Sequence, residues 1–176
     1  MRILHVTGAY YPEFQFGGPP RKIHTFAAGL LRRGHAVRVI TFHSARPCAR
    51  RQVQIEGVDV QYVPWAGRGS WKLPLMLGAL RSAVEWADVV HGYGLYNLLC
   101  PAAARAARQA GRPFVLEPQG MYVPRLRNVP AKRLYHSLFT LRMVVWAARV
   151  IAASPAEADE LAGLVSRDKL VLRRNL

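Results

Sequence analysis

Short runs rich in β-branched residues alternate with longer segments of helical periodicity along almost the whole chain. Between the runs, apolar residues recur at helical spacing, as in HTFAAGLLRRG, where Gly34 ends the pattern. This alternation predicts an α/β fold: a Rossmann-like, doubly wound, mainly parallel sheet flanked by helices. The predicted strands are residues 2–8, 36–42, 58–64, 87–94, 113–120, 148–154 and 168–176.

The alternation runs without a linker, an internal repeat or a low-complexity tract. The chain has 176 residues and is half hydrophobic, so we expect one domain spanning residues 1–176. The arginine-rich connection after Phe42, which contains Pro47 and Gly57, is predicted to be a solvent loop. Further helices are predicted over residues 73–86, 95–113 and 127–148. A last helix is predicted in SPAEADELAGL, with Ser154 as its cap and Pro155 at its first position.

The charge is strongly positive, with 25 Lys and Arg against 10 Asp and Glu and a net charge of +15. Such a surface favours polyanions, anionic lipid headgroups or phosphorylated small molecules. The arginines are scattered and lack interleaved aromatic residues, so we expect no nucleic-acid partner. Cys48 and Cys100 are interpreted as unpaired thiols of a reduced, cytoplasmic chain, and neither a secretory signal nor a run long enough to span a membrane is seen.

The loops that follow the predicted strands hold the candidate site, because parallel strands bring their carboxyl ends to one edge of a sheet. Gly17 and Gly18 precede a predicted helix, whose first N–H groups can hold a phosphate. The surrounding pattern is neither G-x-G-x-x-G nor a Walker loop, which argues against NAD binding and nucleotide hydrolysis. The alternative is a plain turn in which Pro19 and Pro20 fix the entry into the helix.

Two further strand ends carry polar side chains. DVVHGYGLYN supplies His91, Tyr93 and Asn97, and VLEPQGMYVPR supplies Glu117 and Gln119. A carboxylate at this edge can orient a sugar hydroxyl or act as a base. Equally, His91 can be an ordinary core residue, and Glu117 can pair with a nearby arginine and do no chemistry, the candidate partners being Arg125 and Arg127.

Taken in order, these segments resemble the family 4 glycosyltransferases, which are retaining enzymes of the GT-B fold. The resemblance begins in MRILHVTGAYYPEFQFGGPPRKIHTFAAGLLRRGHAVRVITF, with a Y-P dipeptide, paired glycines and the L-x-x-R-G-H helix end. It continues through DVVHGYGLYN, PFVLEPQGMYVPR, ARVIAASPAEADEL and KLVLRRNL, and so covers the whole chain.

The resemblance implies the acceptor-binding half of a hexosyltransferase, with the donor-binding carboxyl-terminal domain absent and this half inactive by itself. It implies a nucleotide-sugar donor, a glycan or lipid-linked acceptor, and neither cofactor nor metal. Gly17 and Gly18 match the glycines that approach the donor diphosphate, and His91 and Gln119 match catalytic positions, although many relatives have His where Gln119 stands. The acceptor cleft is expected to include Tyr93, Asn97, Glu117, Tyr122 and Arg21.

The resemblance also suggests a use for the positive charge. Several members of the family act at the cytoplasmic face of a membrane, so Arg125, Arg127, Lys132 and Arg133, beside an apolar helix, are predicted to contact anionic lipid. Two other readings stay open. One is a Rossmann-like module that binds an anion or polymer, and the other is half of a GT-B phosphorylase or epimerase relative.

Overall fold

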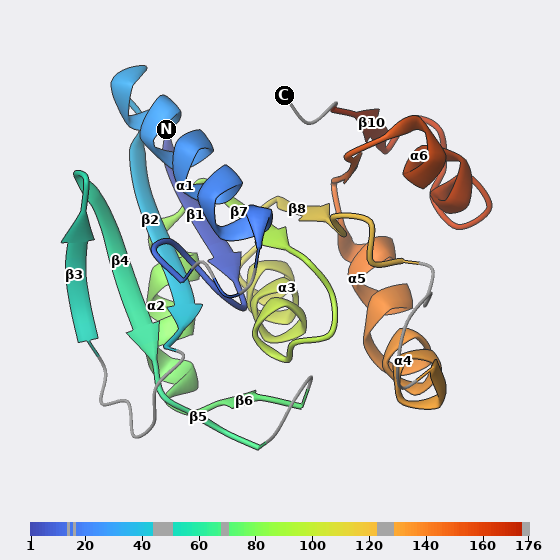
Figure 1. The fold of residues 1–176 in the computed structure, drawn as a ribbon, viewed down its shortest axis with the longest axis horizontal. Coiled ribbons are helices and arrows are strands. Elements are labelled where there is room, and N and C mark those ends of the chain that lie inside the picture. Colours follow the sequence, from blue (N-terminus) through green and yellow to red (C-terminus); the bar gives the residue numbers. More distant parts are fainter. Residues whose placement is uncertain (14, 16, 44–50, 68–70, 123–128, 174–176) are drawn as a thin grey trace.

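The chain forms one eight-stranded sheet with helices on both of its faces (Figure 1). The computed structural model describes residues 1–176 except 14, 16, 44–50, 68–70, 123–128 and 174–176, and leaves the side chains of residues 51 and 129 undescribed. The strand order is β10-β9-β8-β7-β1-β2-β4-β3, and all neighbours pair in parallel except β3 and β4. This arrangement confirms the predicted α/β class.

The elements follow the predicted alternation closely. The parallel strands are β1 (Arg2–Thr7), β2 (Ala36–Phe42), β4 (Val58–Val63), β7 (Val89–Tyr93), β8 (Phe114–Glu117), β9 (Arg149–Ala152) and β10 (Leu170–Leu172). The helices are α1 (Gly18–Arg32), α2 (Leu77–Trp86), α3 (Leu99–Gln109), α4 (Val129–Tyr135), α5 (Leu141–Trp146) and α6 (Pro155–Leu161), with the π-helical turn η2 (His136–Thr140) joining α4 to α5.

The sheet is covered on both faces, as a parallel sheet requires. In β2, Val37 and Val39 pack with residues of α1, whereas Ile40 and Phe42 pack with α2 and α3 on the other face. Figure 1 shows α1 in front of the sheet and α2 and α3 behind it. Because side chains alternate between the two faces, each strand separates an α1 face from an α2/α3 face.

The arginine-rich connection was wrongly expected to be a loop throughout. Part of it is β3 (Arg51–Ile55), which pairs antiparallel with β4. The alternating sequence QVQI suits an edge strand, and Glu56 and Gly57, with φ of 48° and 83°, form the tight turn of a hairpin. Pro47 lies outside the described residues. A second, two-stranded sheet of β5 (Trp65–Ala66) and β6 (Leu73–Pro74) was not predicted.

Two helices begin later than predicted. Helix α3 starts at Leu99 rather than near residue 95, because Tyr96 has a φ of 58° and the Asn97 Oδ1 atom accepts hydrogen bonds from the N–H groups of Leu99 and Cys100. Helix α2 starts at Leu77, after the left-handed Met76. The predicted cap of α6 is confirmed, since Ser154 Oγ accepts a 3.1 Å hydrogen bond from the Glu157 N–H.

The close packing of β7 against β8 gives a test of the fold. A Cβ atom at Gly92 would lie 2.8 Å from Cζ of the buried Phe114 ring, so we expect Gly92→Ala to lower the free energy of unfolding by about 1–3 kcal/mol. Gly78→Ala in α2 is the matched control, because its Cβ meets nothing within 4 Å and alanine favours the helix. Denaturant titration of both variants measures the difference, and equal stabilities would contradict the packing described.

Candidate functional site

The predicted site residues meet at the carboxyl edge of the sheet because of strand register. Tyr93 is paired with Thr7 on one side and with Glu117 on the other. Two residues earlier, His91 is paired with His5 and Val115, so its ring lies on the same face of the sheet as that of Tyr93. His5, His91, Tyr93 and Glu117 are all buried, on the face that α1 covers. The prediction that these strand ends share one edge is confirmed.

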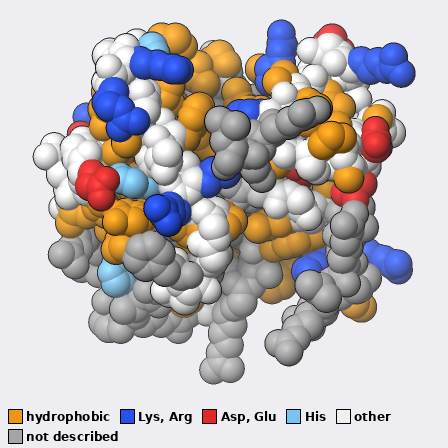
Figure 2. Space-filling view, turned by 45° about the horizontal axis from the view of Figure 1, so that its top comes forward, with side chains coloured by type: hydrophobic (Ala, Val, Ile, Leu, Met, Phe, Trp, Pro, Cys, Tyr) orange, Lys and Arg blue, Asp and Glu red, His pale blue; other side chains and the backbone are white. Residues whose placement is uncertain are grey.

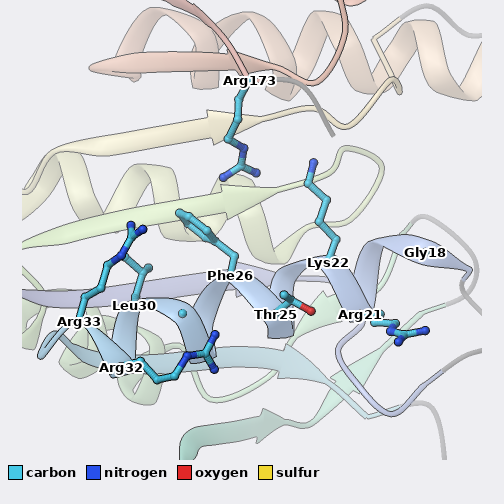
Figure 3. Close-up of a pocket in the computed structure, with 10 residues that line it drawn as sticks. Gly18, Arg21, Lys22, Thr25, Phe26, Leu30, Arg32, Arg33 and Arg173 are labelled. Carbon is cyan, nitrogen blue, oxygen red and sulfur yellow. The ribbon is translucent and has the colours of Figure 1, made fainter. Parts of the chain in front are cut away.

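Glu117 is the centre of a buried ionic cluster. It has no exposed surface, and its Oε1 atom lies 2.6 Å from Lys22 Nζ while its Oε2 atom lies 2.5 Å from an Nη2 of Arg173. In Figure 3, Lys22 and Arg173 point toward each other, one from α1 and the other from the end of β10. The guanidinium of Arg173 also lies 4.7 Å from the centre of the Phe26 ring. One carboxylate therefore joins α1, β8 and the segment after β10.

The cluster keeps Glu117 ionised. Burial by itself would raise the pKa of the Glu117 carboxyl, but contacts with His91 and Lys22 and the charge of Arg173 outweigh burial and lower that pKa to about 2. The partners differ from the arginines that the sequence suggested, since Arg125 and Arg127 lie outside the described residues. Glu117 is thus an anionic anchor, and a carboxylate held in this way is a poor proton acceptor at neutral pH.

A row of rings lies beside this carboxylate. The rings of His91 and Tyr93 stack with centres 4.0 Å apart, and the Tyr93 hydroxyl lies 3.0 Å from Nδ1 of His5. His91 Nε2 is 3.5 Å from Glu117 Oε2, which is long for a hydrogen bond. Desolvation by burial lowers the pKa of His91 and lowers that of His5 further. Both imidazoles are therefore neutral at pH 7.

A cleft opens above these rings at the carboxyl edge. This strand-end cleft has a volume of about 390 Å³ and includes three of the predicted residues, Tyr93, Asn97 and Gln119. The whole lining consists of Thr7, Gly8, Ala9, Pro19, Pro20, Phe42, Lys72, Tyr93, Gly94, Leu95, Tyr96, Asn97, Gln119 and Met121. These residues include no Asp, Glu or His. His91 and Glu117 lie near the cleft but do not line it.

Gln119 sits in the cleft in a strained conformation. Its φ is 60° and that of Gly120 is 75°, and the Met121 N–H donates to the Pro118 carbonyl to close the turn. Gln119 Nε2 is buried without a hydrogen-bond partner among the described residues. The turn is held from β9 and α6, because the buried Glu157 carboxylate accepts 2.5 Å and 2.7 Å hydrogen bonds from the N–H groups of Gly120 and Ala153. A strained, unpartnered amide in a cleft is typical of a binding site.

A second, larger cavity follows α1. This α1 groove has a volume of about 780 Å³ and is lined by Gly18, Arg21, Lys22, Thr25, Phe26, Gly29, Leu30, Arg32, Arg33 and Arg173. Five of these side chains are cationic and none is acidic, so the groove is suited to anionic groups. Figure 3 shows four of these cations along α1 and Arg173 opposite them at the end of β10, and Figure 2 shows Lys and Arg side chains on both halves of this face of the molecule.

The amino terminus of α1 lies between the two cavities. The cap residue Gly17 has a φ of 77°, no side chain caps the helix and its first turn has no acid. Pro19 and Pro20 carry no N–H group, so the free amides of the first turn that can bind an anion here are those of Gly17 and Gly18. A Cβ at Gly18 would meet nothing within 4 Å. The backbone at Gly18 is therefore open to an incoming group.

The remaining predicted residues are not among those that line the cleft. The Tyr122 ring contacts the His136 ring at 5.4 Å, and Lys132 Nζ lies 5.0 Å from the centre of the Tyr96 ring. Arg133 is on α4, whereas Arg125 and Arg127 lie outside the described residues. Cys100 is a buried thiol whose pKa burial raises to about 12, and Cys48 is not described. Among the residues that the structure describes, no group of three or more His, Cys, Asp or Glu side chains could hold a metal ion.

Four residues of the site were missed by sequence reasoning: His5, Lys22, Glu157 and Arg173. His5 could have been found, because it occupies the penultimate inward position of a strand whose end was already a candidate. Glu157 is the acid three residues after Ser154, which is the signature of a capping box. Lys22 and Arg173 could not be predicted as site residues, because nothing in their local sequence indicates contact with Glu117, which lies 95 and 56 residues away from them in the chain.

Comparison with known proteins agrees with this architecture. Residues 17–175 match the family model described as Glycosyl transferase 4-like domain. Over 97 residues the chain is 30% identical to an uncharacterized 42.6 kDa protein in the cps region of Klebsiella pneumoniae, and this match covers 55% of the chain and 24% of that protein.

Three solved structures share the fold over almost the whole chain. Anabaena HepE in complex with UDP-glucose aligns with a TM-score of 0.62 and 17% identity, covering 99% of this chain and 44% of HepE. S. aureus MnaA with UDP aligns with a TM-score of 0.60 and 13% identity, covering 97% and 44%. UDP-GlcNAc 2-epimerase from Neisseria meningitidis, bound to UDP-GlcNAc, aligns with a TM-score of 0.55 and 14% identity, covering 98% and 45%. The chain spans less than half the length of each.

The ionic cluster predicts a pH-dependent stability. Below about pH 6.5, His5 and His91 take up protons in the unfolded chain, whereas in the folded chain their lowered pKa values keep them neutral to lower pH. The free energy of unfolding should therefore start to fall as the pH drops below about 6.5. It should fall again between about pH 4.5 and 2, because Glu117 takes up a proton at higher pH in the unfolded chain than in the folded one.

Replacing Glu117 separates the contribution of its carboxylate to the pH dependence of stability from that of the histidines. Glu117→Gln should lower the free energy of unfolding at pH 7 by about 3 kcal/mol, and the difference from wild type should shrink as the pH falls from 4.5 toward 2. Asp88→Asn, which breaks the exposed pair with Arg2, is the control and should lower the free energy of unfolding far less. Denaturant titration across pH measures both, and a difference that does not vary with pH would contradict the assignment.

Proposed function

The chain belongs to the glycosyl transferase 4-like family, and from that premise we propose that it forms the acceptor-side half of a nucleotide-sugar-dependent glycosyltransferase. The observation that supports this most directly is the strand-end cleft, which Gln119 and Pro19 line from different elements, next to the open backbone at Gly18. The structural neighbours contain UDP-glucose, UDP and UDP-GlcNAc, which favours a nucleotide-sugar donor.

The α1 terminus is proposed to receive the donor diphosphate. The amides of Gly17 and Gly18 and the positive end of the α1 dipole favour an anion, and the side chains of Arg21 and Lys22 lie within the first turn and a half of the helix. Since the chain covers less than half of its structural neighbours, we propose that a second domain supplies the other wall of the donor site.

The chemistry proposed for this half is positioning rather than proton transfer by a side chain. Burial raises the pKa of Tyr96 to about 12 and raises that of Tyr93 well above its ordinary value, and the cleft lining has no carboxylate or imidazole. In a retaining transfer the acceptor hydroxyl oxygen bonds to the anomeric carbon on the face from which the bond to the diphosphate oxygen breaks. The hydroxyl proton then passes to the departing diphosphate. Orientation of the acceptor and stabilisation of the diphosphate charge supply the catalysis.

We propose that the full-length protein transfers its sugar in the cytoplasm to a polysaccharide or glycolipid acceptor. The cps-region relative is consistent with a polysaccharide product.

The role of Gly18 can be tested without disturbing the fold. Because a side chain at Gly18 meets no atom within 4 Å, Gly18→Val should fold with nearly wild-type stability, yet it should place methyl groups where the diphosphate approaches. We expect sugar transfer by the full-length protein to fall about 10- to 100-fold, measured as release of nucleoside diphosphate. Gly163→Val, where a Cβ also meets nothing within 4 Å, is the control. Unchanged transfer by Gly18→Val would refute the placement of the diphosphate.

The strained turn gives a second test. Gln119→Gly should stabilise the fold by about 1 kcal/mol because glycine accepts a positive φ, but it should lower transfer because the amide is lost. Gln119→Asn keeps an amide and tolerates the left-handed conformation, so it should retain more transfer than the glycine variant. Thermal unfolding and initial rates measure the two effects, and full activity in Gln119→Gly would show that the amide takes no part.

An epimerase half is the second candidate, since the fold also aligns with the UDP-GlcNAc 2-epimerase. The two activities separate in a single incubation of the full-length protein with nucleotide-sugars. Conversion of the sugar without any acceptor favours an epimerase, whereas acceptor-dependent release of nucleoside diphosphate favours the transferase.

A further inference from the structure

Three side chains from separate parts of the chain form a hydrogen-bonded relay between α1 and the β3–β4 hairpin. The hydroxyl of Tyr10, which follows β1, lies 2.8 Å from Nδ1 of His24 on α1. The other ring nitrogen of His24, Nε2, lies 2.9 Å from Oε2 of Glu56 in the hairpin turn. Tyr10 has no exposed surface and His24 is buried, whereas the Glu56 side chain is 63% exposed. The relay therefore runs from the surface of the hairpin into the core.

The carboxylate of Glu56 fixes the direction of these hydrogen bonds. An ionised carboxylate only accepts, so Nε2 of His24 carries the hydrogen that faces Glu56. In the neutral imidazole Nδ1 is then an acceptor, and the Tyr10 hydroxyl donates to it. The hydrogen bond from His24 is the main reason why the pKa of Glu56 lies below its ordinary value. The Tyr11 ring also stacks on that of His24, with centres 4.6 Å apart, and so holds the imidazole on its face.

Tyr10 is not placed to react with a substrate. A carboxylate, an imidazole and a hydroxyl in this order can activate the hydroxyl as a nucleophile. Tyr10, however, has no exposed surface, and burial raises the pKa of its hydroxyl. It lines neither the strand-end cleft nor the α1 groove. The relay can therefore act on the site only by fixing the position of Tyr10.

Tyr10 lies in the connection between β1 and α1, and both ends of that connection belong to the candidate site. Before it, Gly8 and Ala9 line the strand-end cleft, and after it Gly17 is the cap residue of α1. The Tyr10 ring is buried in the same core cluster as Tyr93, which also lines the cleft. A buried phenol hydroxyl needs a hydrogen-bond partner, and His24 supplies it. Tyr10 is thus the buried anchor of the connection.

Glu56 keeps an unfavourable backbone conformation. Its φ of 48° lies in the left-handed region, where asparagine, aspartate or glycine is the usual residue of a tight hairpin turn. A residue in such a conformation persists where its surroundings require it. The contact of its side chain with His24 accounts for a glutamate at this position.

We propose that His24 is a positioning residue for donor binding. Together with Glu56 it holds Tyr10, and Tyr10 holds the connection that presents the Gly17 and Gly18 amides to the donor diphosphate. This role of His24 rests on the proposed function, in which those amides receive the diphosphate. Amides that are already in place before the anion arrives need no reorganisation when it binds, so a rigid connection favours binding.

The ratio of the dissociation constants of UDP and uridine tests this role, because only UDP carries a diphosphate. Tyr10→Phe and His24→Leu should each weaken binding of UDP to the full-length protein roughly three- to tenfold, as expected for the loss of one hydrogen bond, and leave uridine binding within about twofold. Calorimetric titration measures both constants. Ile23→Val, which removes a methyl group from the same core cluster and leaves the relay intact, is the matched control. Equal weakening of both ligands, or of neither, would overturn the proposal.

Substitution of Glu56 separates positioning from stability. Glu56→Gly should keep the stability of the wild type, because glycine adopts a positive φ without strain, yet it should weaken UDP binding because His24 loses its carboxylate. Glu56→Gln keeps an oxygen acceptor for His24 Nε2 and should retain the UDP affinity of the wild type. Thermal unfolding and the same titrations measure the two effects. Wild-type UDP affinity in Glu56→Gly would refute the part given to Glu56.

Hydrogen exchange tests the anchor without any nucleotide. In Tyr10→Phe and His24→Leu the amides of Gly8, Ala9 and Glu13 should exchange faster, whereas those of β2 and β4 should not. Unchanged exchange would overturn the proposal. Normal sugar transfer with an unchanged ratio of UDP to uridine binding would refute the role of His24 and leave the proposed function standing. A wild-type protein that binds neither UDP nor a nucleotide-sugar would remove the function and this role together.

Discussion

The buried carboxylate of Glu117 is the contact on which the site depends. It ends β8, takes Lys22 from α1 and Arg173 from beyond β10, and lies beside the His91 and Tyr93 rings. An ion pair of this kind costs desolvation energy and adds little net stability when compared with an apolar contact. Its value is geometric, because α1 and the end of β10 must keep fixed positions for the carboxylate to stay neutralised. The amino terminus of α1 is thereby fixed over the carboxyl edge.

A second carboxylate plays a comparable part on the other side of the cleft. Glu157 binds the N–H groups of Gly120 and Ala153 and so connects the turn after β8 to the start of α6. Gln119 lies inside that turn. Its backbone can keep a left-handed conformation, and its side-chain Nε2 can stay without a hydrogen-bond partner among the described residues, because Glu157 holds the neighbouring Gly120 in place. The two acids that matter most for the site are thus both buried, and both act by positioning other groups.

The positive charge divides between two surfaces. The α1 groove concentrates five cations beside the helix terminus where an anion is proposed to bind. A separate groove of about 270 Å³ combines Arg105 and Arg142 with the exposed Leu73, Leu77 and Leu138, and its lining contains no acid. Since these surfaces lie on different elements, neutralising the cations of one need not alter the other.

Local sequence determined the strands, the parallel sheet and the edge where the site lies. It did so because β-branched runs, helical spacing and caps such as Ser154 are properties of neighbouring residues. The family resemblance was also readable, since motifs at the strand ends occur in a fixed order. The β3 hairpin was missed because its polar QVQI alternation is weak, and a hairpin needs its partner strand to become stable.

Only the tertiary structure decided which residues share the site and which are buried beneath it. Glu117 was a candidate for chemistry until Lys22 and Arg173, distant in sequence, enclosed it. Leu73 and Leu138 showed no relation in the sequence until folding brought β6 and η2 together around one groove. The physical reason is the same in both cases. Periodicity and propensity fix the conformation of each element, whereas burial, pKa and exposure depend on elements that meet only after folding.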